Sequence, residues 1–236
     1  MFIKKILFLL IGIPLYSSAN IQVSPLNVYV SNNNDRFLTV RSMSDQFQYV
    51  LLDSKIIVNP ATENEKEEKY SYSDKDCALV FTPRKLVLPP GSTRKIKLLS
   101  TCVPSSEKVY RLNVSGVNDD TKKKTQLNNN EENTIKMSLS LSWGVLVHVL
   151  PNKTEVSFDI DESKLFNTGN ISVRVNDITY FDRKGACEKE ILDRKIYPEG
   201  GYIRLSKEKN CLTKIVAAEI NYKTRSNKSK KAKVTL

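Results

Sequence analysis

The sequence has few of the residues that carry catalytic and metal chemistry. Its 236 residues include one histidine, one tryptophan and four cysteines. A single imidazole cannot form a zinc site, and no cysteine pair has the Cys-x-x-Cys spacing of a zinc or redox motif. A Gly-x-Ser-x-Gly nucleophile motif and a phosphate-binding glycine loop are also missing. We therefore expect no cofactor, no metal and no enzymatic activity, which disfavours a secreted hydrolase.

Long apolar runs are absent too, except near the N-terminus. Lys4 and Lys5 precede the apolar stretch 6–16, and small residues follow at 17–19. This is the pattern of a secretory signal peptide, and the apolar run is too short to span a bilayer comfortably. We expect residues 1–19 to be removed and the mature protein to be exported to the periplasm or beyond, without membrane insertion.

Acidic residues are outnumbered, since 37 lysines and arginines face 26 aspartates and glutamates. Removal of Lys4 and Lys5 lowers the formal charge from +11 to +9. The basic residues are scattered, and the richest clusters, 122–124 and 228–233, lie in a polar loop and near the C-terminus. Because export separates the protein from nucleic acid, we expect a solvated basic surface or attraction to an acidic partner.

The chain also offers no long amphipathic helix pattern. Short runs typical of strands recur about every eight to twelve residues, separated by turn residues such as Pro89-Pro90-Gly91. The charged stretch 61–75 is expected to be a loop. The pattern predicts an all-β fold of two β-sandwiches. A break near Pro151 divides the mature chain into an N-terminal domain, 20–151, and a C-terminal domain, 152–236.

Four cysteines in an exported protein indicate disulfides, and four thiols allow three pairings. The division into two domains favours Cys77–Cys102 and Cys187–Cys211, because each bond then stays inside one domain. Each bond closes a loop of about 25 residues and contributes about 3 kcal/mol on the chain-entropy model. We therefore expect both bonds to be structural.

Residues 135–143 form the most regular strand pattern in the chain and follow a long polar stretch, 118–134. The large apolar side chains that alternate with polar ones are Ile135, Met137, Leu139 and Leu141. An extended backbone places such a row on one edge. Two interpretations stay open: the row fills the core of its own sandwich, or it is lent to another protein.

Several short motifs occur in an order that resembles a known family. They are Thr82-Pro83, Leu88-Pro89-Pro90-Gly91, Tyr110-Arg111, the run from Gly144 to Pro151, and Asn167-Thr168-Gly169-Asn170. Together with the export signal and the long polar loop, this order resembles the periplasmic chaperones of the chaperone–usher pilus pathway. It is more similar to the alternate branch, which serves colonisation-factor and common-pilus type fimbriae.

The resemblance implies two immunoglobulin-like domains in a boomerang shape and a donor-strand mechanism. A fimbrial subunit lacks its last strand, and the chaperone fills the open groove with a strand of its own. On these terms the donor side chains are Ile135, Met137, Leu139 and Leu141. The implied partners are major and minor fimbrial subunits and an outer-membrane usher, without ATP. Self-association of the free chaperone is left open.

The resemblance also implies an anchor for the subunit's C-terminal carboxylate. In the better-studied members, an arginine on the first strand and a lysine on the donor strand supply it. This chain departs from that pattern, because its first strand, 23–30, has no basic residue and the lysine position falls near Leu146. The remaining candidates are Arg41, Arg111 and His148. His148 has an alternative interpretation as a partly buried strand residue bonded to backbone or water.

Two other functions stay open. A secreted two-domain adhesin or binding module would use 135–141 as an ordinary core strand. A pilus subunit would carry a donor segment at its mature N-terminus, and 20–30 has such an extended pattern. The chain has two halves, each with its own pair of cysteines, and this argues against the single domain of a pilus subunit.

Overall fold

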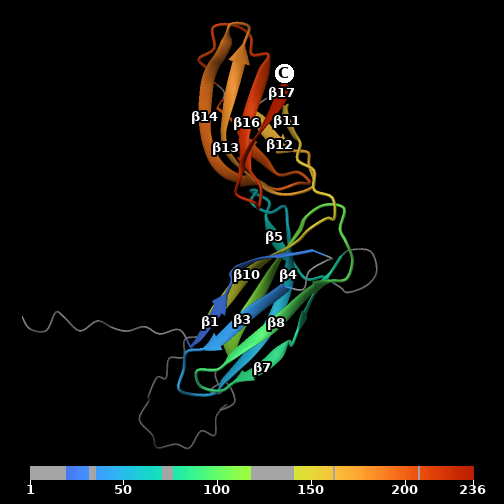
Figure 1. Ribbon diagram of the computed structural model, residues 1–236, viewed down its shortest axis with the longest axis vertical. Helices are drawn as coiled ribbons and strands as arrows, with labels where there is room; N and C mark the ends of the chain where they lie inside the picture. Colours follow the sequence, from blue (N-terminus) through green and yellow to red (C-terminus); the bar gives the residue numbers. More distant parts are fainter. Residues whose placement is uncertain (1–19, 32–35, 71–76, 118–140, 162, 207) are drawn as a thin grey trace, which may run out of the picture.

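The computed structural model describes residues 20–31, 36–70, 77–117, 141–161, 163–206 and 208–236 (Figure 1). Within these ranges the chain forms strands and no helix, so no described helix exists to cross a membrane. The all-β prediction is confirmed. Strands β1–β10 form two sheets, here called the first unit, and β11–β17 form two more, the second unit.

The first unit is a sandwich of a four-stranded and a six-stranded sheet. In spatial order the smaller sheet contains β1 (Ile21–Ser24), β3 (Arg36–Ser42), β8 (Thr93–Ser100) and β6 (Leu79–Thr82). The larger contains β2 (Asn27–Val30), β10 (Ser142–Val149), β9 (Lys108–Val117), β4 (Gln48–Val58) and β5 (Lys66–Glu68), with β7 (Lys85–Leu88) also beside β4. β2 and β10 are parallel, unlike the other pairs of this unit. Leu38, Leu98 and Leu112 are fully buried between the sheets.

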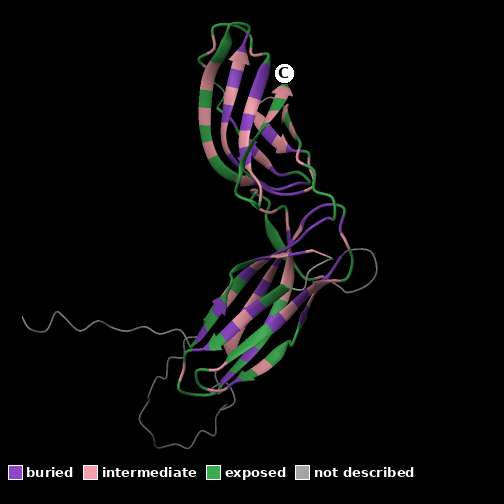
Figure 2. Cartoon of the chain, viewed as in Figure 1, coloured by how far each residue is buried: buried purple, intermediate pink, exposed green. Residues whose placement is uncertain are grey.

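The second unit packs a three-stranded sheet on a four-stranded one. The first contains β11 (Phe158–Asp161), β12 (Lys164–Asn167) and β15 (Tyr202–Arg204). The second contains β14 (Gly185–Ile196), β13 (Val173–Asp182), β16 (Ala217–Lys223) and β17 (Ser229–Thr235). Figure 2 shows buried bands along the central strands β13 and β16, whereas the edge strands β14 and β17 consist almost entirely of exposed and intermediate residues. Three lysines on β17 disfavour edge-to-edge pairing with other chains.

Each unit contains one disulfide. The bonds join Cys77 to Cys102 and Cys187 to Cys211, with Cα atoms 4.9 and 5.1 Å apart. These are the pairs that the sequence predicted. In the first unit the buried hydroxyl of Tyr110 donates to the carbonyl of Cys77, which ties the bond to β9. The disulfides therefore stabilise each sandwich separately.

The two units lie end to end at an angle, with the ends of β2 and β10 pointing toward the second unit (Figure 1). Ile57 and Val109 of the first unit pack on Tyr197 of the second, and half-buried Leu146 lies against them. This small apolar cluster is separate from the two main cores. The junction is therefore a packed contact between the exposed face of the six-stranded sheet and the second unit.

Candidate functional site

Leu141 lies where the apolar row leaves the core of the first unit. The buried side chains of that row in β10 are Val145, Val147 and Val149. Next toward the N-terminus, Trp143 is partly buried against the same core, and its Nε1 donates to the carbonyl of Ile21 at 2.9 Å. The next side chain of the row, Leu141, has 48% of its surface exposed. The row thus continues past the edge of its own core.

The rest of the predicted row, Ile135, Met137 and Leu139, lies outside the described residues. Strand β10 begins at Ser142, directly after Leu141. Its position between β2 and β9 places the start of the strand at the far end of the sheet from the second unit. The donor role of these side chains stays a prediction.

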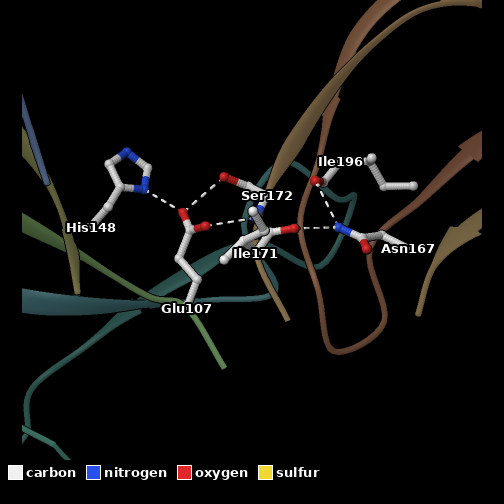
Figure 3. A network of polar contacts seen from close by, with 6 residues as sticks. All are labelled: Glu107, His148, Asn167, Ile171, Ser172 and Ile196. Atoms are coloured by element: carbon white, nitrogen blue, oxygen red, sulfur yellow. Dashed lines mark hydrogen bonds and ion pairs between the residues drawn. The ribbon is translucent and has the colours of Figure 1, made fainter. Parts of the chain in front are cut away.

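A buried carboxylate, Glu107, links the two units (Figure 3). It accepts hydrogen bonds from the backbone N–H of Ser172 (2.6 Å), the Ser172 hydroxyl (2.8 Å) and His148 Nδ1 (2.6 Å). Its own backbone N–H donates to the carbonyl of Asn170 at 2.9 Å. The side chains of Glu107 and His148 are 1% and 0% exposed. One residue of the first unit therefore satisfies several polar groups of the second.

The Asn167-Thr168-Gly169-Asn170 motif shapes the loop that receives Glu107. The buried Asn167 amide donates to the carbonyls of Ile171 and Ile196, at 2.9 and 3.2 Å (Figure 3). The Asn170 amide donates across the junction to the carbonyl of Ser105 at 3.3 Å. A Cβ at Gly169 would lie 2.5 Å from a backbone carbonyl oxygen, so the loop leaves no room for a side chain there. The motif serves the contact between the units.

Glu107 is ionised and His148 is neutral at neutral pH. Burial by itself raises the pKa of the Glu107 carboxyl, but hydrogen bonds from His148 and Ser172 outweigh burial and hold that pKa below its ordinary value. Burial also lowers the pKa of His148, and the nearby Lys195 ammonium lowers it further. The hydrogen bond to Glu107 raises that pKa, but by less than the two other effects lower it. The neutral ring keeps its proton on Nδ1, and Nε2 has no hydrogen-bond partner within the described ranges. Tyr29 stacks on the ring with centroids 4.7 Å apart.

Acid is expected to destabilise the protein, because both pKa values are lower in the folded state than in the unfolded chain. The folded state then binds fewer protons, so stability is full above the ordinary pKa of each group and falls below it. The loss begins near pH 6.5 for His148 and near pH 4.5 for Glu107. It is at most about 1.4 kcal/mol per pH unit for each group. Urea unfolding from pH 8 to 3 measures both losses.

Because His148 is the one histidine in the chain, NMR of an untagged protein reads its ring without ambiguity. We expect the ring to gain its proton in the folded state only below its ordinary pKa of 6.5. The control is the variant His148→Gln. Its stability should not fall between pH 7 and pH 5, because it lacks the imidazole that gains a proton in this range. A ring that gains its proton at pH 6.5 or above would contradict this assignment.

Of the three candidates for the carboxylate anchor, Arg111 is the one that lies beside β10 and is not buried. His148 is buried and paired, so its side chain is closed to a partner's carboxylate. Arg41 lies on β3, in the four-stranded sheet. Arg111 lies on β9 opposite Leu146, where the resemblance places a lysine, and its guanidinium is paired with Glu67 of β5. The structure therefore does not bring the three candidates together.

A basic cavity at the junction was not predicted from the sequence. It has a volume of about 750 Å³, and Asn27 and Tyr29 of β2 line one side. The cations around it come from the second unit, and they are Arg174, Lys195, Lys223, Arg225 and Lys230. Arg225 lies over the ring of Tyr29, 5.7 Å from its centroid. These cations are spread along the sequence, because they come from several strands and a turn. The net positive charge of the chain was therefore the one feature of the sequence that could have predicted a basic cavity. Their potential attracts an anionic partner.

Comparisons with known proteins agree with this architecture. No family model matches the chain. One chain of a chaperone–tip adhesin complex, described as vital for activation of CFA/I fimbriae biogenesis, has a TM-score of 0.74 and 25% identity, over 92% of this chain and 98% of that one. A protein of Escherichia coli that is named as a CFA/I fimbrial subunit is 30% identical over 198 residues, which cover 80% of this chain and 81% of the relative. This chain belongs to the chaperone–usher fimbrial chaperones, in their alternate branch.

The chaperone also shares its fold with the class 5 fimbriae chaperone CfaA. The TM-score is 0.73 at 24% identity, and the match covers 92% of this chain and 98% of CfaA. The relative from Escherichia coli is named as a fimbrial subunit. This name is used both for pilins and for proteins that assemble them. The match to CfaA covers 92% of this chain, so the two proteins share their fold over most of its length.

Proposed function

We propose that the chaperone captures a fimbrial subunit by lending it residues 135–141 and then passes it to an outer-membrane usher. The observation that carries this proposal is the exposure of Leu141 at the end of a row that is buried in β10. An open groove in a partner would cover that row, while backbone groups pair by β-augmentation. The interpretation of the row as an ordinary core strand does not explain why Leu141 is exposed.

The energetics favour such a complex. Burial of a large aliphatic side chain contributes about 1.5–3 kcal/mol. The four side chains of the proposed donor row are Ile135, Met137, Leu139 and Leu141. Together they supply much of the free energy of a tight complex before the costs of ordering are subtracted. No ATP is required, because the binding energy itself drives capture.

We further infer that Arg111 helps to hold the end of the captured subunit, with the basic cavity contributing attraction at longer range. Arg111 lies one strand away from Leu146, the position that carries the anchoring lysine in the resemblance. The cavity opens beside β2, which flanks β10 on its other side. A carboxylate near the middle of β10 would lie between these two sources of positive charge.

The remaining features of the proposal concern location and chemistry. Removal of 1–19 would release the mature chaperone into the periplasm, with immunoglobulin-like domains at 20–151 and 152–236. We infer a non-enzymatic role without a cofactor and without nucleic acid. These inferences rest on the family and on the export pattern of the sequence.

Co-expression with fimbrial subunits tests the function. We expect a stoichiometric complex in the periplasm, whose second component is identified by its intact mass. We also expect an usher gene in the same cluster. A chaperone that is purified alone from cells rich in pilins, or a gene that lies apart from pilins and usher, would favour a secreted binding module instead.

A further inference from the structure

The smaller sheet of the first unit carries cations and no carboxylates. Its strands are β1, β3, β8 and β6, and none of them contains an aspartate or a glutamate. Each of the other three sheets contains such residues, and two of their ion pairs join Glu67 to Lys55 and Glu219 to Lys231. The charge of the smaller sheet is therefore of one sign. Its cations are Arg36, Arg41, Arg94, Lys95 and Lys97.

Three of these cations lie on the face of the sheet that points to solvent. The even-numbered residues of β3 from 38 to 42 and of β8 from 96 to 98 are buried. Successive side chains of a strand point to opposite faces, so the odd-numbered ones, which include Arg41, Lys95 and Lys97, point outward. The register places Arg41 opposite Thr93 and Lys95 opposite Thr39. Arg41 and Lys95 are therefore diagonal neighbours, about 7–8 Å apart. Figure 2 shows the exposed stretches of β3 and β8.

Arg41 and Lys95 have no anionic neighbour that offsets their repulsion. Both are exposed, and neither forms an ion pair with another residue that the structure describes. The side chains beside them carry an amide or a hydroxyl, because Gln22 of β1 is opposite Arg41 and Ser24 is opposite Thr39. Like charges on neighbouring strands destabilise a sheet. A layer of external anions would therefore stabilise this face.

An aromatic ring lies among these cations. Phe37 of β3 has 46% of its surface exposed, and Nζ of Lys95 lies 5.9 Å from the centroid of its ring. Basic side chains together with an exposed aromatic one are the combination by which amphipathic segments bind the headgroup region of a membrane. The strands that carry these side chains are neighbours in one sheet, so the charges are spread over a surface. Such an array fits the repeated phosphates of a lipid layer better than it fits one small anion.

We propose that the outward face of the smaller sheet, which carries Phe37, Arg41, Lys95 and Lys97, binds the surface of a membrane that contains anionic phospholipids. The lipid phosphates supply the anions that the sheet lacks, and the chaperone adsorbs without inserting a strand. The face belongs to the four-stranded sheet, whereas β10 belongs to the six-stranded one. Adsorption therefore leaves Leu141 and the row before it accessible to a partner. The proposal goes beyond the proposed function and does not depend on the capture of a subunit.

Co-sedimentation of the full-length mature chaperone with lipid vesicles tests the proposal. We expect binding to vesicles of phosphatidylcholine with phosphatidylglycerol and none to pure phosphatidylcholine, with a steep loss as salt shortens the range of the attraction. Each cation near an anionic surface strengthens binding about 5-fold. The double variant Arg41→Gln and Lys95→Gln should therefore bind about 25-fold more weakly. Both side chains are exposed, so this variant should stay folded, which circular dichroism checks.

The matched control is the double variant Lys228→Gln and Lys233→Gln. It removes the same net charge from two exposed positions of the second unit. Its affinity for the anionic vesicles should stay within about 2-fold of the wild type, because these lysines lie outside the proposed face. Equal weakening by the two double variants would show that net charge alone attracts the chaperone and would overturn the assignment to this face.

A paramagnetic lipid added to the anionic vesicles locates the bound surface by NMR. We expect it to broaden the amide signals of β3 and β8 more than those of β13 and β16. Stronger broadening in the second unit, or equal binding to pure phosphatidylcholine, would overturn the proposal. Polyglutamate serves as an acidic polypeptide without lipid. If it bound the wild type but not the variant Arg41→Gln and Lys95→Gln, while vesicles bound neither, the face would serve an acidic protein and the membrane proposal would be wrong.

Discussion

Replacing Leu139 and Leu141 together by Asp abolishes capture of the fimbrial subunit and leaves the chaperone folded. Each leucine contributes about 1.5–3 kcal/mol when a partner buries it, and a carboxylate in an apolar groove adds a further cost of desolvation. The expected loss of affinity is at least about 100-fold. Pull-down of co-expressed subunit measures the capture, and circular dichroism with thermal unfolding measures the fold.

The matched control for this double variant places the same charges on the opposite edge. Ser138 and Ser140 alternate with the leucines in the sequence, so their replacement by Asp should leave capture within a few-fold of the wild type. Leu141 is already 48% exposed in the free protein, which is why its loss should not unfold the first unit. A double leucine variant that unfolds would show that the row belongs to the chaperone's own core.

Replacing Glu107 by Leu destabilises the contact between the units by about 3–5 kcal/mol. The substitution keeps a similar volume but removes the acceptor for the Ser172 backbone N–H, the Ser172 hydroxyl and His148 Nδ1. Buried donors that lose their partner retain their full cost of desolvation, and breaking a buried pair on one side typically costs this much. Urea unfolding measures the loss, and amide exchange near Ser172 locates it.

Glu199→Gln is the control for this effect at the same junction. Glu199 pairs with Lys108 at 3.1 Å, but the two side chains are 54% and 30% exposed. Water and salt screen such a pair, so its removal should cost less than about 1 kcal/mol. If both variants lost the same small amount of stability, the buried network would not be what holds the units together.

Features that depend on neighbours along the chain could be predicted from the sequence. Strands are recognisable from alternation and turn residues, and the two disulfides follow once the chain is divided near Pro151. The stretch 61–75 was expected to be a loop because it is charged. The structure instead places the strand β5 there, because pairing with the edge of β4 outweighs its weak local preference.

Features that depend on distant residues could not be predicted. Glu107 has no distinctive neighbours in the sequence, and its partners lie 41 and 65 positions away. Arg111 was identified as a candidate anchor, but its pairing with Glu67, 44 positions away, needs the register of three strands. His148 was counted as a candidate anchor because a lone histidine in an apolar run gives no indication of its partner. Its burial against Glu107 appears only once the two units meet.

The position of Trp143 gives the chaperone an optical reporter of its own working surface. It is the one tryptophan in the chain, it lies two residues from Leu141, and its N–H is held by the carbonyl of Ile21. A partner seated over Leu141 would displace water from around the indole and move its fluorescence emission to shorter wavelength. Loading and release of partners that lack tryptophan can then be timed in a stopped-flow instrument without attaching a dye.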